Sequence, residues 1–202
     1  MSALTVVPTG TANIASVLAA FRRLGVEPVV ARDVTTVDES DRVVVPGVGS
    51  FGAAMSELDR LGMRDTLNQR LDEGRPTLAI CVGMQLLAAA SEESTGVEGL
   101  GHIAGRVTRF PDTVRVPQLG WNQVVVGPGC KILDDGWAYF ANSYRIETVP
   151  DGWSGAATDH GGRFVAALER GNVLACQFHP ELSGSWGGNI LNRWLRNTER
   201  GA

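Results

Sequence analysis

The chain has 202 residues, 44% hydrophobic and 20% charged, which is the composition of a folded globular protein rather than a disordered one. Its 18 basic and 22 acidic side chains give a formal net charge of -4, which argues against nucleic acid or an anionic membrane as a partner. The 3 cysteines are widely spaced, so we expect neither a disulfide framework nor a cysteine-rich zinc site, and a cytoplasmic location fits. We expect no signal peptide and no membrane span, since a span needs about 20 apolar residues.

The first half of the sequence alternates short apolar runs with stretches of helical periodicity. Such alternation predicts βαβ units and a mostly parallel sheet that is covered on both faces. We interpret Pro46-Gly47-Val48-Gly49 as a turn after its strand. The expected strands are 4–7, 27–30, 42–45 and 77–80, and the expected helices lie around 14–24, 51–58, 67–74 and 84–90.

The middle of the chain changes to short strand-like runs separated by Gly, Pro, Asn and Asp. These runs predict antiparallel additions to the sheet, at 103–110, 123–126, 138–140 and 144–147. Further on, we expect strands at 164–168 and 173–178, a hairpin turn at Arg170-Gly171-Asn172 and a helix at 189–196. No linker-like segment interrupts the pattern, so we expect residues 1–202 to form a single domain.

Cys81 stands at a predicted strand-to-helix junction. The apolar run 77–80 leads into it, and Gly83 follows. This order is typical of a nucleophile elbow, in which a sharp turn raises the reactive side chain above the edge of the sheet. A helix N-terminus beside the thiol would favour the thiolate, which is the reactive form. The pattern alone also fits a buried structural cysteine.

His179 is the histidine best placed to serve as a base. It ends the apolar run 173–178, and Pro180 prevents the strand from continuing. We therefore expect the imidazole at a carboxyl end of the sheet, where sites form in open α/β folds. Glu181 could orient the ring, so that Cys81, His179 and Glu181 form a nucleophile, base and orienting group. The remaining histidines, His102 and His160, stand beside glycines and are interpreted as loop residues.

A glycine-containing stretch could supply an oxyanion hole. Gly47, Val48 and Gly49 follow the predicted strand 42–45. Glycines at such a place allow backbone N–H groups to approach a developing negative oxygen. Taken alone, a stretch of this kind is weak evidence and is usually just a turn.

Together these stretches resemble the class I, triad-type glutamine amidotransferases. The matching stretches are Pro46-Gly47-Val48-Gly49-Ser50-Phe51-Gly52, Cys81-Val82-Gly83-Met84-Gln85-Leu86-Leu87 and Gln177-Phe178-His179-Pro180-Glu181. Four features narrow the resemblance to the glutaminase subunits of imidazole glycerol phosphate synthases: the stretch Pro46–Gly52, Met84 where other relatives have His, Leu119-Gly120-Trp121-Asn122, and Gly184. The resemblance runs from about Thr9 to Trp194.

The resemblance implies an α/β fold, a flavodoxin-like three-layer αβα domain with a mostly parallel central sheet and antiparallel additions. It implies no metal and no organic cofactor. The implied reaction is hydrolysis of L-glutamine to glutamate and ammonia. The ammonia would pass to a HisF-type cyclase, a (β/α)8 barrel, which forms imidazole glycerol phosphate and AICAR in histidine biosynthesis.

The resemblance also implies a role for each matching residue. Cys81 would attack the substrate amide, His179 would take and return the proton, and Glu181 would orient His179. The oxyanion hole would consist of the backbone N–H groups of Val48, Gly49 and Val82. Glutamine would be bound by Gly49, Gln85, Ser143 and Tyr144. The stretch Trp121-Asn122 would lie near the partner interface.

Some positions depart from the commonest family pattern, namely Pro8, Ala12, Ala79, Gln118, Asn142 and Leu182. Relatives often have a basic residue at position 182 that pairs with a partner carboxylate, and Arg145 is a candidate to replace it. Two alternatives remain beside the main interpretation. One is a degenerate, non-enzymatic amidotransferase domain, which the intact triad disfavours. The other is a different class I amidotransferase or a cysteine hydrolase on this fold, which Met84 and Leu119–Asn122 disfavour.

Overall fold

A nine-stranded sheet with the order β2-β1-β3-β4-β12-β11-β10-β7-β8 runs through the computed structural model, which describes residues 3–10 and 13–199. The neighbours from β2 to β12 pair in parallel. These strands are β1 (Leu4–Val6), β2 (Val29–Val30), β3 (Arg42–Gly47), β4 (Thr77–Cys81) and β12 (Val173–Cys176). Every residue of β3, β4 and β12 is buried, which explains their continuous apolar runs.

The other half of the sheet is antiparallel, as predicted. Its strands are β11 (Arg163–Arg170), β10 (Ser154–Asp159), β7 (Gln118–Val126) and β8 (Gly136–Asn142). The predicted hairpin turn joins β11 to β12, with Arg170 opposite Val173. The strand predicted at 123–126 is longer than expected, because it begins at Gln118 and includes Leu119–Asn122.

A second sheet of three strands corrects two predictions. It consists of β5 (Ala88–Ser91), β6 (Ile103–Arg109) and β9 (Tyr144–Arg145). The runs near 103–110 and 144–147 therefore do not extend the central sheet. The helix predicted at 84–90 is also wrong: α5 covers only Val82–Gln85, and β5 follows. The reason is tertiary, since the loop after β5 takes its backbone carbonyls, with Gly99 N–H donating to Ala89 O at 3.0 Å.

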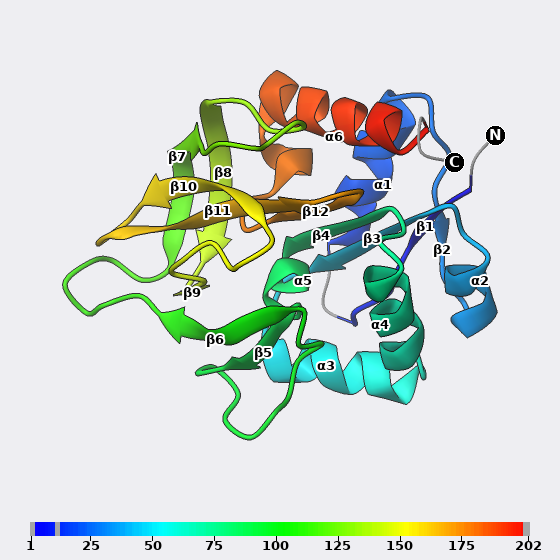
Figure 1. The fold of residues 1–202 in the computed structure, drawn as a ribbon, viewed down its shortest axis with the longest axis horizontal. Helices are drawn as coiled ribbons and strands as arrows, with labels where there is room; N and C mark the ends of the chain where they lie inside the picture. The colour runs from blue at the N-terminus through cyan, green and yellow to red at the C-terminus, as the bar shows by residue number, and fades with distance from the viewer. Residues whose placement is uncertain (1–2, 11–12, 200–202) are drawn as a thin grey trace.

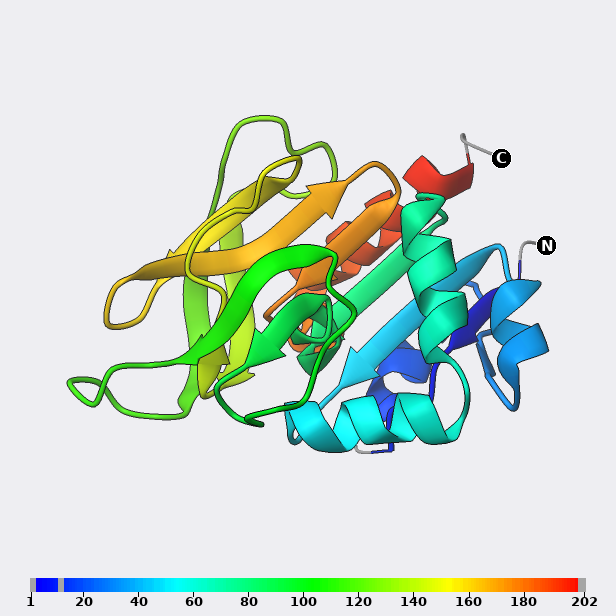
Figure 2. The same ribbon diagram turned by 60° about the horizontal axis from the view of Figure 1, so that its bottom comes forward.

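Helices cover both faces of the central sheet, which confirms the three-layer expectation (Figures 1 and 2). On one face lie α1 (Ile14–Arg23) and α6 (Gly184–Glu199), joined by an edge-to-face contact between Phe21 and Trp194. On the other lie α3 (Phe51–Arg60) and α4 (Arg64–Asp72). The short α2 (Val34–Asp38) was not predicted, and α6 begins before the expected residue 189.

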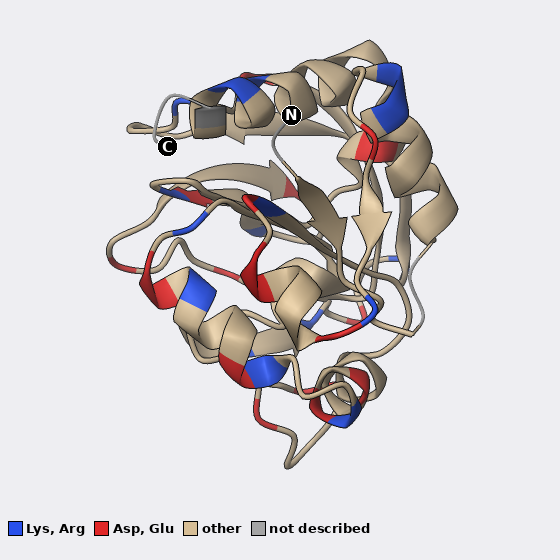
Figure 3. Cartoon of the chain, turned by 90° about the vertical axis from the view of Figure 1, so that its right-hand side faces the viewer, with Lys and Arg blue, Asp and Glu red and all other residues tan. Residues whose placement is uncertain are grey.

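The outer faces of the helices carry both signs of charge. Figure 3, which shows the side of the molecule on the right in Figure 1, has basic and acidic residues interspersed along the helices. Several form ion pairs on the surface, such as Arg60 with Glu57 at 2.7 Å and Arg64 with Asp59 at 2.5 Å. Exposed pairs of this kind each contribute about 0–1 kcal/mol. Among the described helices, none has the length and apolar character needed to cross a membrane.

Candidate active site

Cys81 is the last residue of β4 and has a strained backbone. In the described part of the chain it is the one non-glycine residue with positive φ, at φ 55 and ψ -111. The turn is tight because α5 packs directly on β3: a Cβ on Gly83 would lie 1.9 Å from Val45 O. This sharp strand-to-helix turn has the backbone geometry expected of a nucleophile elbow. Because α5 spans only four residues, we assign its dipole a smaller effect on the sulfur than the sequence suggested.

His179 and Glu181 lie beside Cys81 because β12 is the parallel neighbour of β4, with Cys176 opposite Ile80. The His179 N–H donates to Tyr139 O at 2.9 Å, which fixes the backbone after the strand. Glu181 follows on a 3-10 turn, η1 (Pro180–Leu182). Its Oε1 lies 2.8 Å from His179 Nδ1, and the two side chains are 5% and 3% exposed. A carboxylate on Nδ1 leaves Nε2 for proton exchange with the sulfur.

The charge state of His179 follows from these neighbours. Burial lowers the pKa of His179, but hydrogen bonds to Cys81 and Glu181 and their negative charge outweigh burial and raise the pKa to about 10. The folded site therefore favours the protonated, cationic form of His179. A cationic imidazole between a cysteine and a carboxylate could serve a cysteine nucleophile as its proton carrier.

Two further groups touch the Cys81 sulfur, and sequence reasoning missed both. Gln177 Nε2 donates to Cys81 Sγ at 3.7 Å, and Sγ lies 3.9 Å from Ala141 O on β8. A signal for Gln177 existed in the sequence. It stands two residues before His179, within the run 173–178 that the sequence predicts as a strand, where alternate side chains face the same side. In the structure that strand ends earlier, at Cys176.

The predicted oxyanion residues lie next to the elbow. Gly47 pairs with Cys81, so Val48 and Gly49 follow β3 at the end of the sheet where Cys81 lies, and Val82 begins α5. Gly49 has φ 96, a conformation that glycine adopts readily. Pro46 and Gly47 belong to β3 rather than to a turn, because they continue the ladder opposite Ile80 and Cys81.

The predicted glutamine-binding residues are linked to each other. The buried Gln85 donates from Nε2 to Tyr144 O at 3.2 Å and to Gln177 Oε1 at 2.9 Å. Ser143 O accepts from Phe110 N at 3.1 Å, which holds this segment against β6. Gln85 thus anchors the Ser143–Tyr144 backbone. Of the unusual positions, Ala79 fits within β4, and Ala12 lies outside the described residues.

The other histidines have structural partners. His102 Nε2 contacts Asn68 Oδ1 at 3.1 Å, and His160 Nε2 contacts Arg115 O at 2.7 Å. Burial lowers the pKa of His102. Neither of these hydrogen bonds involves Cys81, His179 or Glu181, which agrees with the interpretation of both histidines as loop residues. Among the described residues, no cluster of His, Cys, Asp and Glu is arranged to hold a metal ion.

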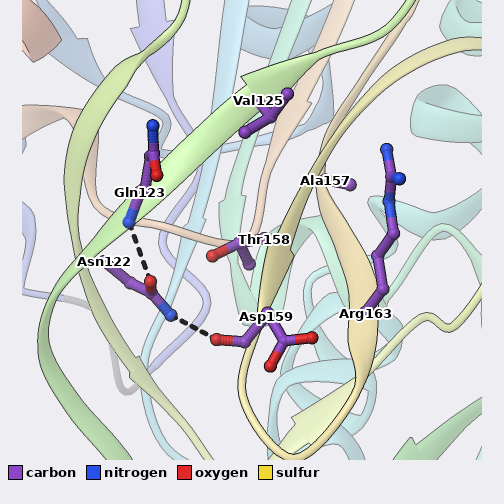
Figure 4. A pocket seen from close by; sticks show the side chains of 7 residues that line it. All are labelled: Asn122, Gln123, Val125, Ala157, Thr158, Asp159 and Arg163. Carbon is purple, nitrogen blue, oxygen red and sulfur yellow. Dashed lines mark hydrogen bonds between the residues drawn. The ribbon is translucent and has the colours of Figure 1, made fainter.

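A pocket of about 260 Å³ lies on the antiparallel half of the sheet (Figure 4). There Asn122 Nδ2 donates to Asp159 O at 2.7 Å, which ties β7 to the end of β10. Asn122 therefore has a structural role in addition to its predicted place near the partner. The lining residues are Asn122, Gln123, Val125, Ala157, Thr158, Asp159 and Arg163, none of them a predicted catalytic residue.

Comparison with known proteins gives extensive matches. A model of the family Glutamine amidotransferase class-I matches residues 6–197. The Imidazole glycerol phosphate synthase subunit HisH of Methanothermobacter thermautotrophicus is 40% identical over 95% of this chain and 97% of its own length. The subunit HisH of Symbiobacterium thermophilum is 40% identical over 97% and 94% of the two chains. Imidazole glycerol phosphate synthase hisHF, chloroplastic, from Arabidopsis thaliana is 41% identical over 96% of this chain and 34% of the plant chain.

Solved structures share the fold. A crystal structure of a glutamine amidotransferase superposes with a TM-score of 0.79 over 98% of this chain and 100% of the other, at 20% identity. A crystal structure of a putative GMP synthase protein from Thermoplasma acidophilum superposes with a TM-score of 0.72 over 100% and 96% of the two chains, at 22% identity. These two likenesses concern the fold alone. The family match and the sequence relatives go further, because they extend over nearly the whole chain and the relatives are about 40% identical. The chain belongs to the class-I glutamine amidotransferase family, and within it to the HisH subunits of imidazole glycerol phosphate synthase.

Proposed function

We propose that this chain hydrolyses L-glutamine to glutamate and ammonia as the glutaminase subunit of an imidazole glycerol phosphate synthase. The observation that carries the proposal is the 2.8 Å contact of Glu181 with His179, behind the strained elbow of Cys81. A structural cysteine needs neither the strain nor the polarised histidine. The relatives that are 36% to 41% identical are named as imidazole glycerol phosphate synthases or their HisH subunits, which supports this choice of synthase.

In the proposed reaction, the Cys81 thiolate attacks the carbon of the substrate side-chain amide. A C–S bond forms, the carbonyl electrons move to oxygen, and the tetrahedral intermediate collapses as His179 protonates the departing ammonia. Water, deprotonated by His179, then attacks the thioester, and glutamate leaves with the regenerated thiolate. Glu181 keeps the imidazole oriented through both steps. The residues Cys81 and His179 therefore each act twice.

We place the oxyanion hole at the backbone N–H groups of Val48, Gly49 and Val82, which surround the elbow. An N–H aimed at the tetrahedral oxygen is worth about 3–4 kcal/mol. Glycine at position 49 allows its peptide to rotate, since φ 96 is open to glycine at low cost. Glutamine would be held by Gly49, Gln85 and the Ser143–Tyr144 backbone.

The proposed partner is a HisF-type cyclase with a (β/α)8 barrel, and we place the complex in the cytoplasm. Three large apolar side chains near the triad are exposed, namely Leu119 at 64%, Trp121 at 55% and Leu182 at 40%. Leu119 and Trp121 are two positions apart on β7, so their side chains lie on the same face of the strand. Trp121 approaches Gly184, which comes shortly after η1. We call these three residues the apolar patch. In a complex the patch would be covered, and ammonia would leave the site toward the cyclase.

The test is glutamine hydrolysis by the chain with its cognate cyclase, and covalent capture by a glutamine-like diazoketone. We expect Cys81→Ala to abolish hydrolysis while the fold and the complex persist. Peptide mass spectrometry should find the label on Cys81. Cys130 and Cys176 are internal controls, because burial raises the pKa of both thiols. Label on either of them, or full activity in Cys81→Ala, would contradict the proposal.

A further inference from the structure

Gln177 is a fully buried polar residue that touches the nucleophile and has no task in the mechanism above. It lies between β12 and His179, with 0% of its surface exposed. Its backbone N–H donates to Ala166 O at 2.8 Å, so its Cα is fixed by the strand ladder. Buried carboxamides in proteins are hydrogen-bonded at both ends, and each end of this one has a specific partner.

The orientation of the Gln177 carboxamide follows from a fixed backbone group. Tyr144 O is a carbonyl and can only accept, so the group of Gln85 that meets it at 3.2 Å must be the NH2. The second N–H of that NH2 reaches Gln177 at 2.9 Å, and its partner must therefore be the carbonyl oxygen Oε1. This leaves the Gln177 NH2 facing Cys81 Sγ at 3.7 Å. A flipped amide would set two NH2 groups against each other.

The two neutral groups on the sulfur act in opposite directions. Ala141 O, at 3.9 Å from Sγ, accepts a hydrogen bond from the thiol and offers nothing to the thiolate. The Gln177 NH2 donates to sulfur, and such a bond is stronger when the sulfur is ionised. Cys81 is only 3% exposed, so water does not replace a lost donor to its sulfur.

We propose that Gln177 is a positioning residue for glutamine hydrolysis: its NH2 holds the Cys81 sulfur as an oriented thiolate, and its carbonyl oxygen, through Gln85, ties that sulfur to the Tyr144 backbone. The role in turnover rests on the proposed function. The chain of hydrogen bonds from Tyr144 through Gln85 and Gln177 to Cys81 also has a consequence for substrate binding. A ligand that moves the Ser143–Tyr144 backbone would move the donor on the sulfur as well.

The variant Gln177→Met tests the proposal, because it keeps the side-chain length and removes both hydrogen-bonding groups. The readout is the pH profile of iodoacetamide alkylation at Cys81 in the full chain, followed by peptide mass spectrometry. A hydrogen bond to an ionised group is stronger than one to a neutral group, so we expect alkylation at neutral pH to slow by about 10-fold or more. The midpoint of the profile should move upward by about one pH unit or more. With the cyclase present, kcat should fall more than KM for glutamine rises.

The matched control is Gln69→Met on α4, where the side chain is exposed and donates to Glu73 at 2.8 Å. It should leave the Cys81 profile unchanged. If Gln177→Met does not fold, Gln85→Met serves instead, because it frees the Gln177 amide to rotate; the midpoint should shift in the same direction by less. An unchanged midpoint in the folded variant would overturn the proposal, even if activity falls. Alkylation needs no glutamine, so absence of glutaminase activity in the unaltered chain would defeat the proposed function and not this result.

Discussion

Cys81 has two unusual properties that belong together. Its backbone lies at φ 55 and ψ -111, where a non-glycine residue is strained by about 1–3 kcal/mol. The surrounding structure imposes this conformation, because a Cβ on Gly83 would clash with Val45 O at 1.9 Å and a Cβ on Gly47 would lie 2.8 Å from Val82 Cβ. The strain lifts the sulfur out of the sheet toward His179. Packing of two glycines therefore fixes the direction of the nucleophile.

Glu181 should control the protonation of His179, and this gives a pH-dependent prediction. In the folded chain the pKa of His179 is raised to about 10, against an ordinary value of 6.5 in the unfolded chain. Between these values the folded state binds a proton that the unfolded state does not, so stability from this group is full below 6.5 and is lost as pH rises through about 10. Glu181→Gln removes one cause of the raised pKa. We expect a lower pKa and a flatter loss of stability between about pH 7 and 9 than in the parent chain.

Two measurements check this prediction. The NMR titration of the His179 ring proton follows its pKa directly, and urea unfolding at several pH values follows the free energy. Cys81→Ala is the companion variant, because the hydrogen bond to Cys81 also raises this pKa. If His179 titrates at the same pH in Glu181→Gln as in the parent chain, the carboxylate does not polarise the ring.

At the scale of elements, we expect the contact between α6 and η1 to hold Glu181 in place. Alanine substitutions at two adjacent glycines of α6 test this expectation. A Cβ on Gly187 would lie 2.1 Å from Pro180 O, whereas a Cβ on Gly188 would meet nothing within 4 Å. Gly187→Ala must push η1 away, and we expect a loss of about 1–3 kcal/mol in the free energy of unfolding, together with lower glutaminase activity. Gly188→Ala should instead stabilise the helix by up to about 1 kcal/mol.

Urea unfolding of the two alanine variants provides the comparison, since the chemistry of the change is identical. Equal effects at the two positions would show that helix propensity, rather than the close approach to Pro180, governs this contact. The Gly188 variant also controls for activity, because it leaves η1 where it is.

The elements that the sequence predicted well are those decided by local chemistry. The run into Cys81 and the run ended by Pro180 both have strand patterns with clear ends. The sequence therefore suffices to select Cys81, His179 and Glu181 as candidate catalytic residues. The segment Ala88–Ser91 was misassigned because alanine favours a helix, while the partners that make it a strand lie on β6 and in the loop around Gly99. Strand β10 (Ser154–Asp159) lacks an apolar alternation and depends on its neighbours β7 and β11.

Long-range contacts explain what was missed at the site. Gln177 and Cys81 are 96 positions apart in the sequence, as a result of the crossover that places β12 beside β4. The spacing of Gln177 from His179 places the two side chains on one side, but it does not show that Gln177 reaches the sulfur of Cys81. The same holds for Ala141 O, which reaches the sulfur from β8. A positioning contact of this kind becomes visible only when the strand order is known.

At the scale of the whole molecule, the site lies where the two halves of the sheet meet. Strands β12 and β8 are separated by β11, β10 and β7 in the order of the sheet. Nevertheless Tyr139 O on β8 accepts from His179 N at 2.9 Å, so the antiparallel half curls back to the triad. In Figure 1, β7 and β8 run across the direction of β11 and β12. The apolar patch begins on β7, the neighbour of β8. A partner that binds the patch would therefore bear on the strand that contacts both Cys81 and His179.

The residue Leu182 gives the prediction that concerns the complex. It is 40% exposed and follows Glu181 on η1, where a basic residue could pair with a partner carboxylate. The candidate cation Arg145 is already engaged, since it pairs with Glu147 at 3.1 Å and lies over the Phe110 ring. Arg23 is better placed, because it lines a pocket of about 590 Å³ together with Glu181 and Leu182.

We therefore expect Leu182→Lys to weaken the complex with the cognate cyclase or to leave its affinity unchanged. The new ammonium would replace an apolar contact and would lie near the like charge of Arg23, and both effects oppose binding. A carboxylate left without a partner in this interface would cost about 1–3 kcal/mol, so the cognate cyclase should either lack an acid at this point or pair it with Arg23. Isothermal titration of both chains against that cyclase measures the difference, and Arg23→Met distinguishes the two cases by weakening the complex only if Arg23 pairs. Binding of Leu182→Lys that is tenfold tighter, about 1.4 kcal/mol, would mean that the cyclase presents an acid which Arg23 does not satisfy.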